Sequence, residues 1–537
     1  MRSVMRLKKV AVLGAGPGGL YAARLIKRSH PDAVVDVFEQ TRPGSTFGFG
    51  VGIAAGTQRN LDDADPQSLQ AVVDQAWTHE MSMKVGDHTV TLPQDNLRSI
   101  ARTTLLTTLE QCAREVGVQI HYGAREDADS LSADVVIAAD GVSSATRERY
   151  ADDFGATVAL GRSYYLWCGT DFALPRAIFV PAVSEHGVFV AHAYPYAADR
   201  STFLVETDER SWRAAGFDVT SERTPQNETD EPSLRYLERA FSEELGGHRL
   251  IGNRTRWNRF RTVTCRQWSR GNVVLLGDAA HTAHYSIGSG TKLAMEDAIA
   301  LELALREHRD VTDALAAYEA MRRPAVEHLQ AIARRSSAWW EAFPSRMTLP
   351  VESLMMSYMT RAGKISIERF SSAAPELTRA ALTAYGDRDA MSVPDDDLTS
   401  WVLESDVSVG GRTFGSRLVT REDFATITDV EVDLQEAWSA AGDSLLATVL
   451  HGDGAEGHVL WLHGPSGRDA LLSRLDFAER IRLARHDRCV VVEGPSRYIG
   501  DLAAGLASMR TTFVALDDES DHRATSPNGD AVAAVHG

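Results

Sequence analysis

A glycine-rich turn close to the start of the chain constrains its fold more than any other feature. The apolar run Lys9–Leu13 predicts a buried strand, which leads into the turn GAGPGG (Gly14–Gly19) and then a helical pattern, LYAARLIKR. A second predicted strand, Val34–Phe38, ends at Glu39, twenty residues after the turn. A strand, a G-x-G-x-x-G turn, a helix and a second strand that ends in an acid are the parts of a dinucleotide-binding βαβ unit.

Each position of this motif has an expected role in binding a dinucleotide. Gly14 makes the tight turn, Gly16 lets the backbone approach a pyrophosphate, and Gly19 lets helix and strand pack closely. The helix N-terminus faces the phosphates. Glu39 is expected to accept hydrogen bonds from the adenosine ribose, and Gln40 follows it at the same site. The motif geometry by itself fits both FAD and NAD.

Two later strand ends carry acidic residues. The run Asp134–Ala139 predicts a strand that ends in Asp140-Gly141, and Val273–Leu276 predicts one that ends in Gly277-Asp278. A carboxylate at the carboxyl end of a strand can accept hydrogen bonds from sugar hydroxyls. Both loops therefore predict further contacts with a nucleotide.

The stretch after Asp278 predicts a ligand clamp at a helix N-terminus. Gly288-Ser289-Gly290 and Thr291 open the helix, and Asp297 lies within it. The backbone N–H groups of the glycine segment and the helix dipole stabilise negative charge in a ligand.

Together the three motifs resemble those of the single-component FAD-dependent aromatic hydroxylases, which have the para-hydroxybenzoate hydroxylase fold. The resemblance spans residues 5–345. It implies FAD as cofactor, NAD(P)H and O2 as co-substrates, and no second G-x-G-x-x-G motif for NAD(P)H.

The resemblance also implies roles for single residues. In the family, the aspartate at the place of Asp278 binds the ribityl or ribose hydroxyls of the flavin, and the segment at Asp140 serves both FAD and the pyridine nucleotide. The glycine segment Gly288–Thr291 would lie at the N1–O2 edge of the flavin. An arginine at the place of Arg102 contacts the flavin. The other interpretation of Arg102 is a solvated residue at a helix start.

Within this family, the stretch from Thr282 onward, TAHYSIGSGTKLAMEDAIAL, is similar to a narrower clade. Tyr285 stands where the wider family usually has a proline, and Lys292 where it has an asparagine. The clade comprises the salicylyl-CoA 5-hydroxylases, the flavin half of the anthraniloyl-CoA monooxygenases and the violacein-pathway hydroxylase. Further segments that match it are Ser45–Ile53, Tyr165–Phe172, His186–Tyr196, Ser201–Gly216 and Ser336–Phe343.

The resemblance implies an aromatic ring hydroxylase that acts through a flavin C4a-hydroperoxide, with an aryl-CoA thioester of the salicylyl or anthraniloyl type as substrate. A second interpretation keeps the fold and changes the substrate to an indole or another natural-product aromatic. A non-catalytic flavin-binding protein and a two-electron oxidase or reductase also fit the motifs, because binding motifs do not prove oxygen chemistry.

The catalytic candidates are His284, Tyr285 and His192. His284 and Tyr285 occupy the loop expected to face the flavin and the substrate, and the alternative for His284 is a cap on a backbone carbonyl. Alternation along a predicted strand puts His192 on one face with Tyr194 and Tyr196, but it does not say which face meets the ligand.

For three other features near this loop, we expect a role in the fold rather than in catalysis. His281 directly follows GDAA and is expected to pack behind the loop. Lys292 and Glu296 are spaced as a solvated i,i+4 pair, with a place near the flavin edge as the alternative for Lys292. Trp339 and Trp340 are expected in the core.

The fold class is predicted as α/β, with a Rossmann-like FAD-binding domain, an inserted mixed β-sheet substrate domain and a small C-terminal α/β domain. Residues 164–208 alternate polar and apolar between turn residues, which predicts a meandering sheet that would cover the flavin. The predicted boundaries are 1–75, 97–160 and 266–345 for the FAD-binding domain, 76–96 and 161–265 for the substrate domain, and 346–385 for late helices.

A linker at 386–400 is predicted to precede the C-terminal domain, residues 401–516, and a disordered tail from 517 to 537. Fragments of this domain faintly resemble the first hairpin and last βα units of an old-yellow-enzyme-like barrel. A complete (β/α)8 barrel needs about 250 residues. We therefore expect a shrunken remnant that serves stability or dimerisation, with no FMN; a thioredoxin-like module is the alternative.

Charge and cysteine content narrow the partners and the compartment. The net charge of −18 argues against binding to nucleic acid or anionic membranes. The four cysteines are scattered without a C-x-x-C motif, which fits the reducing cytoplasm and argues against a metal site. No stretch is long and apolar enough to span a membrane. The expected location is the cytoplasm. A homodimer is one of the assembly states that we expect.

Overall fold

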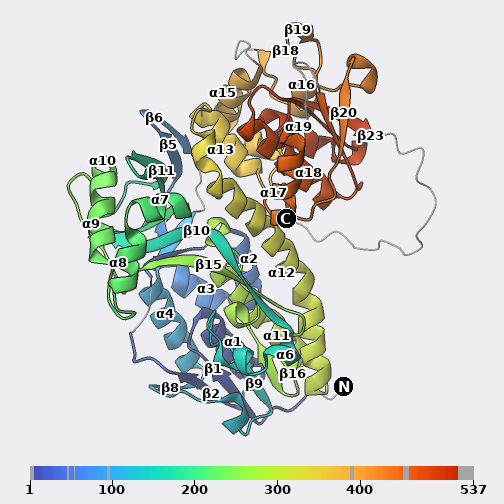
Figure 1. The fold of residues 1–537 in the computed structure, drawn as a ribbon. Helices are drawn as coiled ribbons and strands as arrows, with labels where there is room; N and C mark the ends of the chain where they lie inside the picture. Colours follow the sequence, from blue (N-terminus) through green and yellow to red (C-terminus); the bar gives the residue numbers. More distant parts are fainter. Residues whose placement is uncertain are drawn as a thin grey trace. The chain divides into compact units, whose positions relative to one another are not determined.

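The computed structural model describes residues 5–44, 48–53, 55–93, 97–288, 290–386, 392–451 and 459–517. Contacts divide the chain into two compact units (Figure 1). Unit 1 comprises Met1–Lys84 and Gln94–Ser337, and unit 2 comprises Val85–Pro93 and Ala338–Gly537. The late helices thus group with unit 2, whereas the sequence analysis puts its boundary at 385. None of the described helices has the length and apolar content needed to cross a membrane.

Unit 1 contains a six-stranded sheet with the order β16-β17-β9-β1-β2-β8 (Figure 1). All of its strands are parallel except the edge strand β16. The strands are β1 (Lys9–Leu13), β2 (Val34–Glu39), β8 (Gln119–Tyr122), β9 (Val135–Ala138), β16 (Ser269–Arg270) and β17 (Val273–Leu275). The four predicted strands are therefore confirmed. Because carboxyl ends of parallel strands share one edge, the loops after β1, β9 and β17 gather there.

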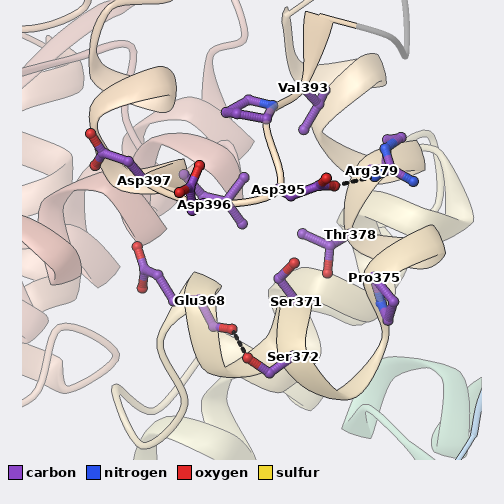
Figure 2. Close-up of a pocket in the computed structure, with 12 residues that line it drawn as sticks. Glu368, Ser371, Ser372, Pro375, Thr378, Arg379, Val393, Asp395, Asp396 and Asp397 are labelled. Atoms are coloured by element: carbon purple, nitrogen blue, oxygen red, sulfur yellow. Dashed lines mark hydrogen bonds and ion pairs between the residues drawn. The ribbon is translucent and has the colours of Figure 1, made fainter.

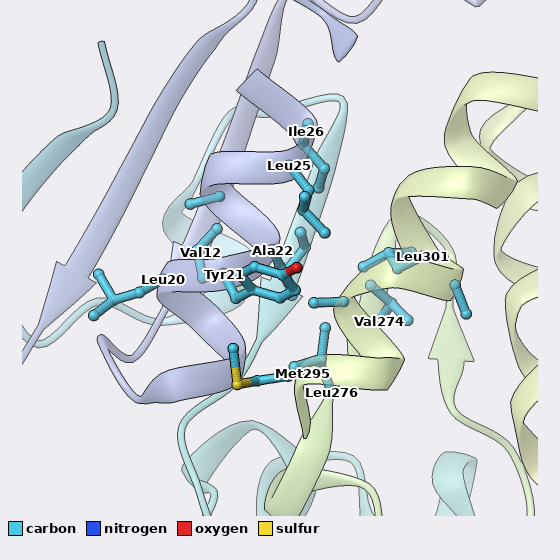
Figure 3. Packing of buried hydrophobic residues seen from close by; sticks show 14 of the residues in the cluster. Val12, Leu20, Tyr21, Ala22, Leu25, Ile26, Val274, Leu276, Met295 and Leu301 are labelled. Atoms are coloured by element: carbon cyan, nitrogen blue, oxygen red, sulfur yellow. The ribbon is translucent and has the colours of Figure 1, made fainter. Parts of the chain in front are cut away.

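Two helices leave this edge and pack closely against each other. They are α1 (Pro17–Ser29) and α11 (Gly290–Glu307), and Figure 3 shows their apolar side chains facing one another. A Cβ on Gly18 would lie 2.7 Å from Leu276 Cδ2 and 2.9 Å from Ala294 Cβ. A Cβ on Gly277 would lie 2.9 Å from the same alanine. Glycine at both positions lets the helices approach.

The buried carboxylate of Asp297 on α11 ties the loop after β17 to two helices. Its Oδ2 accepts hydrogen bonds from Gly277 N at 3.1 Å and His281 Nε2 at 2.8 Å. Its Oδ1 accepts one from Arg322 Nε at 2.9 Å, on α12 (Val311–Glu341). Burial would raise the pKa of Asp297, but His281 and Arg322 outweigh it and hold that pKa below its usual range. The carboxylate is therefore the ionised centre of a satisfied buried network.

Further helices and short strands complete this part of unit 1. They are β3 (Gly50–Ile53), α2 (Ala55–Ala64), α3 (Pro66–Val73), β4 (Trp77–Thr78), β7 (Arg98–Ala101), α4 (Arg102–Glu115), α5 (Ala145–Arg149) and α6 (Ala151–Phe154). Strands β3, β7 and β4 form a small antiparallel sheet.

The second large sheet of unit 1 is mixed, as predicted for the substrate domain. Its order is β14-β10-β13-β12-β11-β5, and β15 also pairs with β10. The strands are β5 (Met81–Val85), β10 (Ala156–Thr170), β11 (Ala177–Ser184), β12 (Gly187–Ala197), β13 (Arg200–Thr207), β14 (Leu250–Ile251) and β15 (Trp257–Cys265). Strands β11, β12 and β13 form the predicted meander, and β5 pairs with β11 in parallel.

One face of this sheet packs in a hydrophobic core. Leu166, Ala191 and Phe203 share that face and are fully buried. The core also contains residues of four covering helices, among them Trp212, Phe217, Leu237 and Leu245. The helices are α7 (Glu209–Ala214), α8 (Phe217–Arg223), α9 (Glu231–Ala240) and α10 (Ser242–Leu245). The opposite face of the sheet is therefore the one available for chemistry.

Unit 2 contains a four-stranded parallel sheet whose order, β20-β21-β22-β23, follows the sequence. Consecutive βα units of a (β/α)8 barrel have this order. The barrel-remnant interpretation stays a prediction. The predicted tail lies outside the described residues except for Asp517, which ends β23.

The elements of unit 2 begin with β6 (His88–Leu92), α13 (Val351–Thr360), α14 (Ile367–Ala373), α15 (Pro375–Gly386) and α16 (Leu398–Leu403). A hairpin of β18 (Val407–Val409) and β19 (Arg412–Phe414) follows. The remaining elements are β20 (Ile427–Glu431), α17 (Ala440–His451), β21 (Val459–His463), α18 (Arg468–Ala484), β22 (Cys489–Pro495), α19 (Ile499–Ala507) and β23 (Phe513–Asp517).

Asp297→Asn is expected to lower the free energy of unfolding by about 1.5–3 kcal/mol, because the buried Arg322 guanidinium loses the nearer of its carboxylate partners and keeps Glu296, at 3.3 Å. Urea unfolding of the full chain measures this. Because the folded pKa of Asp297 is depressed, its contribution is full above the ordinary carboxyl pKa and is lost as pH falls through the folded pKa. The variant should lack this part of the acid dependence. The control Glu307→Gln, at the exposed end of α11, should change stability by less than about 0.5 kcal/mol.

Candidate functional site

The turn after β1 requires glycine where the motif predicts it. Gly14 has φ +101°, and a Cβ there would lie 2.4 Å from the carbonyl oxygen of Ala139. A Cβ on Gly19 would lie 2.2 Å from the carbonyl oxygen of Gly14. The backbone N–H of Gly14 donates to Phe38 O on β2 at 2.8 Å. The turn is thus held tightly between β2 and the loop after β9.

Other glycines at this edge face open space. A Cβ added to Gly16, Gly141, Gly288 or Gly290 would meet no atom within 4 Å. Gly16 precedes α1, and Gly288 and Gly290 lie at the start of α11, so both helix N-termini open onto this edge. Backbone donors and helix dipoles that converge here suit the phosphates and the electron-rich edge of a flavin. The donor set fits FAD. Ser289 lies outside the described residues, and Thr291 is half-buried in the first turn of α11.

Three predicted cofactor carboxylates lie at this edge, with Glu39 at the end of β2 and Asp140 and Asp278 in the loops. Glu39 accepts hydrogen bonds from Ala15 N at 2.9 Å and from Thr41 N at 2.8 Å. Asp140 Oδ2 accepts from Thr146 N at 3.2 Å. Asp278 keeps solvent-accessible area although protein surrounds its carboxylate, and Gln40 is exposed. Glu39 therefore lies beside the glycine turn, where a ribose would follow the phosphates.

Arg102 and Asp278 form an electrostatic pair across this edge. Arg102 is the first residue of α4, and its backbone N–H donates to Phe49 O at 2.7 Å. Burial lowers the pKa of Arg102, and Asp278 opposes this. Desolvation by surrounding protein raises the pKa of Asp278, and Arg102 and His281 oppose that shift. Arg102 is therefore a buried residue close to Asp278, which disfavours the solvated interpretation, and its contact with the flavin stays a prediction.

Arg147 joins two of the loops. This buried side chain on α5 donates from Nη2 to Val142 O at 2.6 Å and from Nη1 to Ala279 O at 3.1 Å. Val142 follows Asp140-Gly141, and Ala279 follows Gly277-Asp278. One guanidinium thus fixes the distance between two strand-end loops that lie far apart in the sequence.

Strand register identifies the face of the substrate sheet that carries the candidate residues. Glu206 on β13 lies opposite Tyr165 on β10 and Val190 on β12. His192 lies opposite Phe179 on β11. Directly opposite residues share a face, so these side chains are all on the face away from the hydrophobic core. The sequence could not choose between the two faces; the covering helices make that choice.

The loop before α11 holds the other two candidates. His284 Nδ1 accepts a hydrogen bond from Ser286 N at 3.3 Å and lies 2.9 Å from Ser286 Oγ. It therefore caps a backbone N–H rather than the carbonyl that the structural alternative expected. The centre of the Tyr285 ring lies 4.0 Å from the centre of the His284 ring. It lies 5.0 Å from the ring centre of Tyr165 and 6.3 Å from that of His192. His192, His284 and Tyr285 are thus brought together.

Glu206 is a member of this cluster that the sequence analysis missed. It is 4% exposed, and its Oε2 lies 3.3 Å from His192 Nε2. Burial would raise the pKa of Glu206, but His192, His284 and Tyr285 outweigh it and the pKa lies below its usual range. The available signal was a carboxylate within the apolar run of strand residues 203–207, FLVET.

Two of the three structural interpretations agree with the contacts, and the third does so in part. His281 is buried and bonded to Asp297 behind the loop. Lys292 Nζ lies 3.6 Å from Glu296 Oε1, but the two side chains are only 23% and 11% exposed, so the predicted pair forms without being solvated. Trp339 and Trp340 are buried.

A separate pocket of about 450 Å3 lies in unit 2, between α14, α15 and the segment before α16 (Figure 2). Glu368, Asp395, Asp396 and Asp397 line it, and Arg379 Nη2 binds Asp395 Oδ1 at 2.7 Å. Within the described ranges, no group of three or more His, Cys, Asp or Glu side chains is placed to hold a metal ion. The four carboxylates do not suit an anionic flavin, and no aromatic side chain is among the described residues that line this pocket.

Comparisons with known proteins agree with the geometry of unit 1. Residues 93–333 match the family described as FAD binding domain. A salicyloyl-CoA 5-hydroxylase of a Streptomyces species is 45% identical over 340 residues, which is 62% of this chain and 66% of that protein. A 3-hydroxy-4-methyl-anthranilyl-(aryl-carrier protein) 5-monooxygenase of Streptosporangium sibiricum is 40% identical over 67% of this chain and 95% of that protein.

More distantly similar proteins are also named as oxygenases. The protodeoxyviolaceinate monooxygenase of Chromobacterium violaceum is 29% identical over 66% of this chain and 94% of that protein. The solved structure of a tetrameric form of 2-methyl-3-hydroxypyridine-5-carboxylic acid oxygenase has a TM-score of 0.50 and 22% identity, over 66% of this chain and 96% of that one. The predicted fold is confirmed.

Arg147→Met is expected to weaken FAD binding by about 10- to 100-fold, because charge-assisted hydrogen bonds contribute about 1.5–3 kcal/mol and their loss releases the two loops from each other. The dissociation constant of FAD, measured by fluorescence of the released flavin, tests this. Arg149→Met on the same helix is the matched control, since its ion pairs with Asp127 and Asp129 are at the surface. Equal FAD affinity in both variants would contradict the role of Arg147.

Proposed function

Because this chain belongs to the FAD-dependent aromatic hydroxylases, we propose that it hydroxylates the aromatic ring of an aryl thioester of the salicylyl or anthraniloyl type. The observation that carries the proposal is the set of glycine loops with open space at the sheet edge, next to the aromatic and histidine-bearing face of the second sheet. Two relatives at 45% and 40% identity are named for hydroxylation of such thioesters, one on CoA and one on a carrier protein.

FAD held in this cradle would supply the redox chemistry that activates O2, with NAD(P)H as electron donor. The protein positions the cofactor and the ring. The N-termini of α1 and α11 would stabilise negative charge on the phosphates and on the flavin edge. Glu39 and Gln40 would bind the adenosine ribose, and Asp140, Asp278 and the segment Gly288–Thr291 would hold the flavin chain and ring.

The aromatic face would orient the ring and exclude water. Tyr165 and Tyr285 would flank the ring, with His284 and His192 next to them. Positioning of this kind converts a bimolecular step into an effectively intramolecular one. An ortho hydroxyl or amine would itself activate the ring, so the protein needs no strong base.

A second candidate keeps the chemistry and changes the substrate. The Chromobacterium violaceum relative is named for protodeoxyviolaceinate, and we therefore keep an indole or another natural-product aromatic as the second substrate class. We place the reaction in the cytoplasm, because all four cysteines are free and buried.

Turnover of the purified yellow protein tests the substrate directly. NADH and NADPH oxidation should accelerate by about tenfold or more with salicylyl-CoA or anthraniloyl-CoA, because a correctly bound ring couples reduction to hydroxylation. The product mass should rise by one oxygen. Free salicylate and indoles are the comparison compounds. If only indoles accelerate NAD(P)H oxidation, the second candidate substrate class is supported instead. If no compound accelerates it although FAD is bound, the result is evidence against a hydroxylase.

His284→Ala is expected to keep FAD but lower coupled hydroxylation by about 100-fold, because the ring loses a neighbour that orients it and a misplacement of about 1 Å has an effect of this size. The ratio of hydroxylated product to H2O2 measures the coupling. His284→Asn separates the two roles, since an amide oxygen can still accept the Ser286 N–H bond. If Asn restores coupling, His284 serves only as the cap; if it does not, the imidazole itself is required.

A further inference from the structure

The carboxylate of Glu206 occupies an unusual place in the substrate sheet. It lies on β13, on the face away from the hydrophobic core, and is 4% exposed. Its sequence neighbours Val205 and Thr207 are buried on the other face. A buried carboxylate costs several kcal/mol of desolvation unless partners compensate for it. The groups that surround Glu206 therefore decide what it can do.

Glu206 has acceptor capacity that the protein does not use. His192 Nε2 lies 3.3 Å from Oε2, and the Tyr285 side chain also lies near enough to interact with the carboxylate. Neither contact has good hydrogen-bond geometry, so most of the lone-pair positions of the carboxylate are unused by the described part of the chain. His192, His284 and Tyr285 are close enough to keep the carboxyl ionised against the effect of burial. An ionised carboxylate is a pure acceptor with about four lone-pair positions. Buried polar atoms are normally satisfied, and an exception points to a missing donor.

Aromatic side chains surround this acceptor. Tyr165 is directly opposite Glu206 in the sheet, and its ring centre lies 5.0 Å from that of Tyr285. Phe179 meets the His192 ring edge-on at 5.2 Å. Tyr165 and Tyr285 are only half-buried. A flat aromatic molecule that brings its own N–H or O–H group matches both the walls and the acceptor.

Tyr165 also links Glu206 to the flavin side of the site. Its ring centre lies 5.0 Å from that of Tyr285, which belongs to the loop that runs from Asp278 to α11. In agreement with this, the Asp278 carboxylate adds to the rise that burial causes in the pKa of Tyr165. Asp278 belongs to the loop after β17, at the candidate cofactor edge. The unfilled acceptor and the cofactor edge are therefore on the same side of the substrate sheet.

We propose that Glu206, supported by His192, binds the hydrogen-bond-donating substituent of the aromatic substrate, an amine or a hydroxyl on the ring. The inference rests on the proposed function and specifies its substrate class. The substituent donates to Glu206, and His192 holds the carboxylate in place from β12. A pair that served the fold alone would have no need of unused acceptor positions. Asp297, which does serve the fold, accepts three well-placed donors.

Ligand discrimination by the FAD-loaded full chain tests this proposal. The probes are two matched pairs: anthraniloyl-CoA with benzoyl-CoA, and 2-aminobenzamide with benzamide. Dissociation constants come from the perturbation of the flavin absorbance. The unmodified protein should favour the amino ligand of each pair by about 10- to 100-fold, because a hydrogen bond to a charged group is lost with the other ligand.

Substitutions at Glu206 should remove this preference. In Glu206→Gln the ratio should fall at least threefold, because a neutral amide oxygen accepts a weaker bond. In Glu206→Leu it should approach one. Glu209→Gln, an exposed carboxylate three residues on, should keep the full ratio. FAD content is measured for each variant. The ratio compares two ligands on one folded protein, so a general loss of stability does not mimic the effect.

The outcomes separate this inference from the proposed function. An unchanged ratio in Glu206→Gln and Glu206→Leu overturns the inference, even if the protein hydroxylates aryl thioesters. Absence of binding to both CoA thioesters, with a Glu206-dependent ratio for the benzamides, supports the inference and overturns the thioester substrate. Absence of binding to all four probes overturns both. If one Glu206 variant fails to bind FAD, the other decides.

Discussion

The buried carboxylate of Asp297 is the interaction on which the rest of unit 1 depends. It accepts hydrogen bonds from Gly277 N, His281 and Arg322, and so connects the loop after β17 with α11 and α12. The position of α11 sets where its N-terminus points, and Gly18 and Gly277 allow it to lie against α1. Two helix N-termini then face the same open space. An electrostatic cradle for an anionic cofactor follows from this one satisfied charge.

Asp297 and Glu206 show two uses of a buried carboxylate. Asp297 has its oxygens occupied by three donors, which makes it a rigid structural centre. Glu206 has His192 at 3.3 Å and Tyr285 nearby, and neither gives it a hydrogen bond of good geometry. The difference is the number of donors that the fold supplies. A saturated carboxylate stabilises the protein, whereas an unsaturated one beside aromatic rings is suited to a ligand.

Unit 2 has its own polar interior. Arg346 binds Glu479 through two hydrogen bonds, from Nε at 2.8 Å and from Nη2 at 2.7 Å, and both side chains are buried. This pair joins the segment before α13 to α18, and so connects the late helices to the parallel sheet. The connection explains why contacts group residues after 338 with the C-terminal unit. It also shows why a linker-like composition at 386–400 was a poor marker of the boundary between units.

The sequence by itself determined the βαβ unit, the three strand-end loops and the α/β class, because these depend on local requirements. Gly14 and Gly19 are needed for backbone approach, and apolar runs of strand length must be buried. The sequence also identified His192, His284 and Tyr285 as candidate catalytic residues. Only the tertiary structure decided which face of the second sheet carries them, because alternation defines two faces and the covering helices bury one. It also decided that Glu206 joins them, since a strand register that pairs residues more than forty positions apart has no local signal.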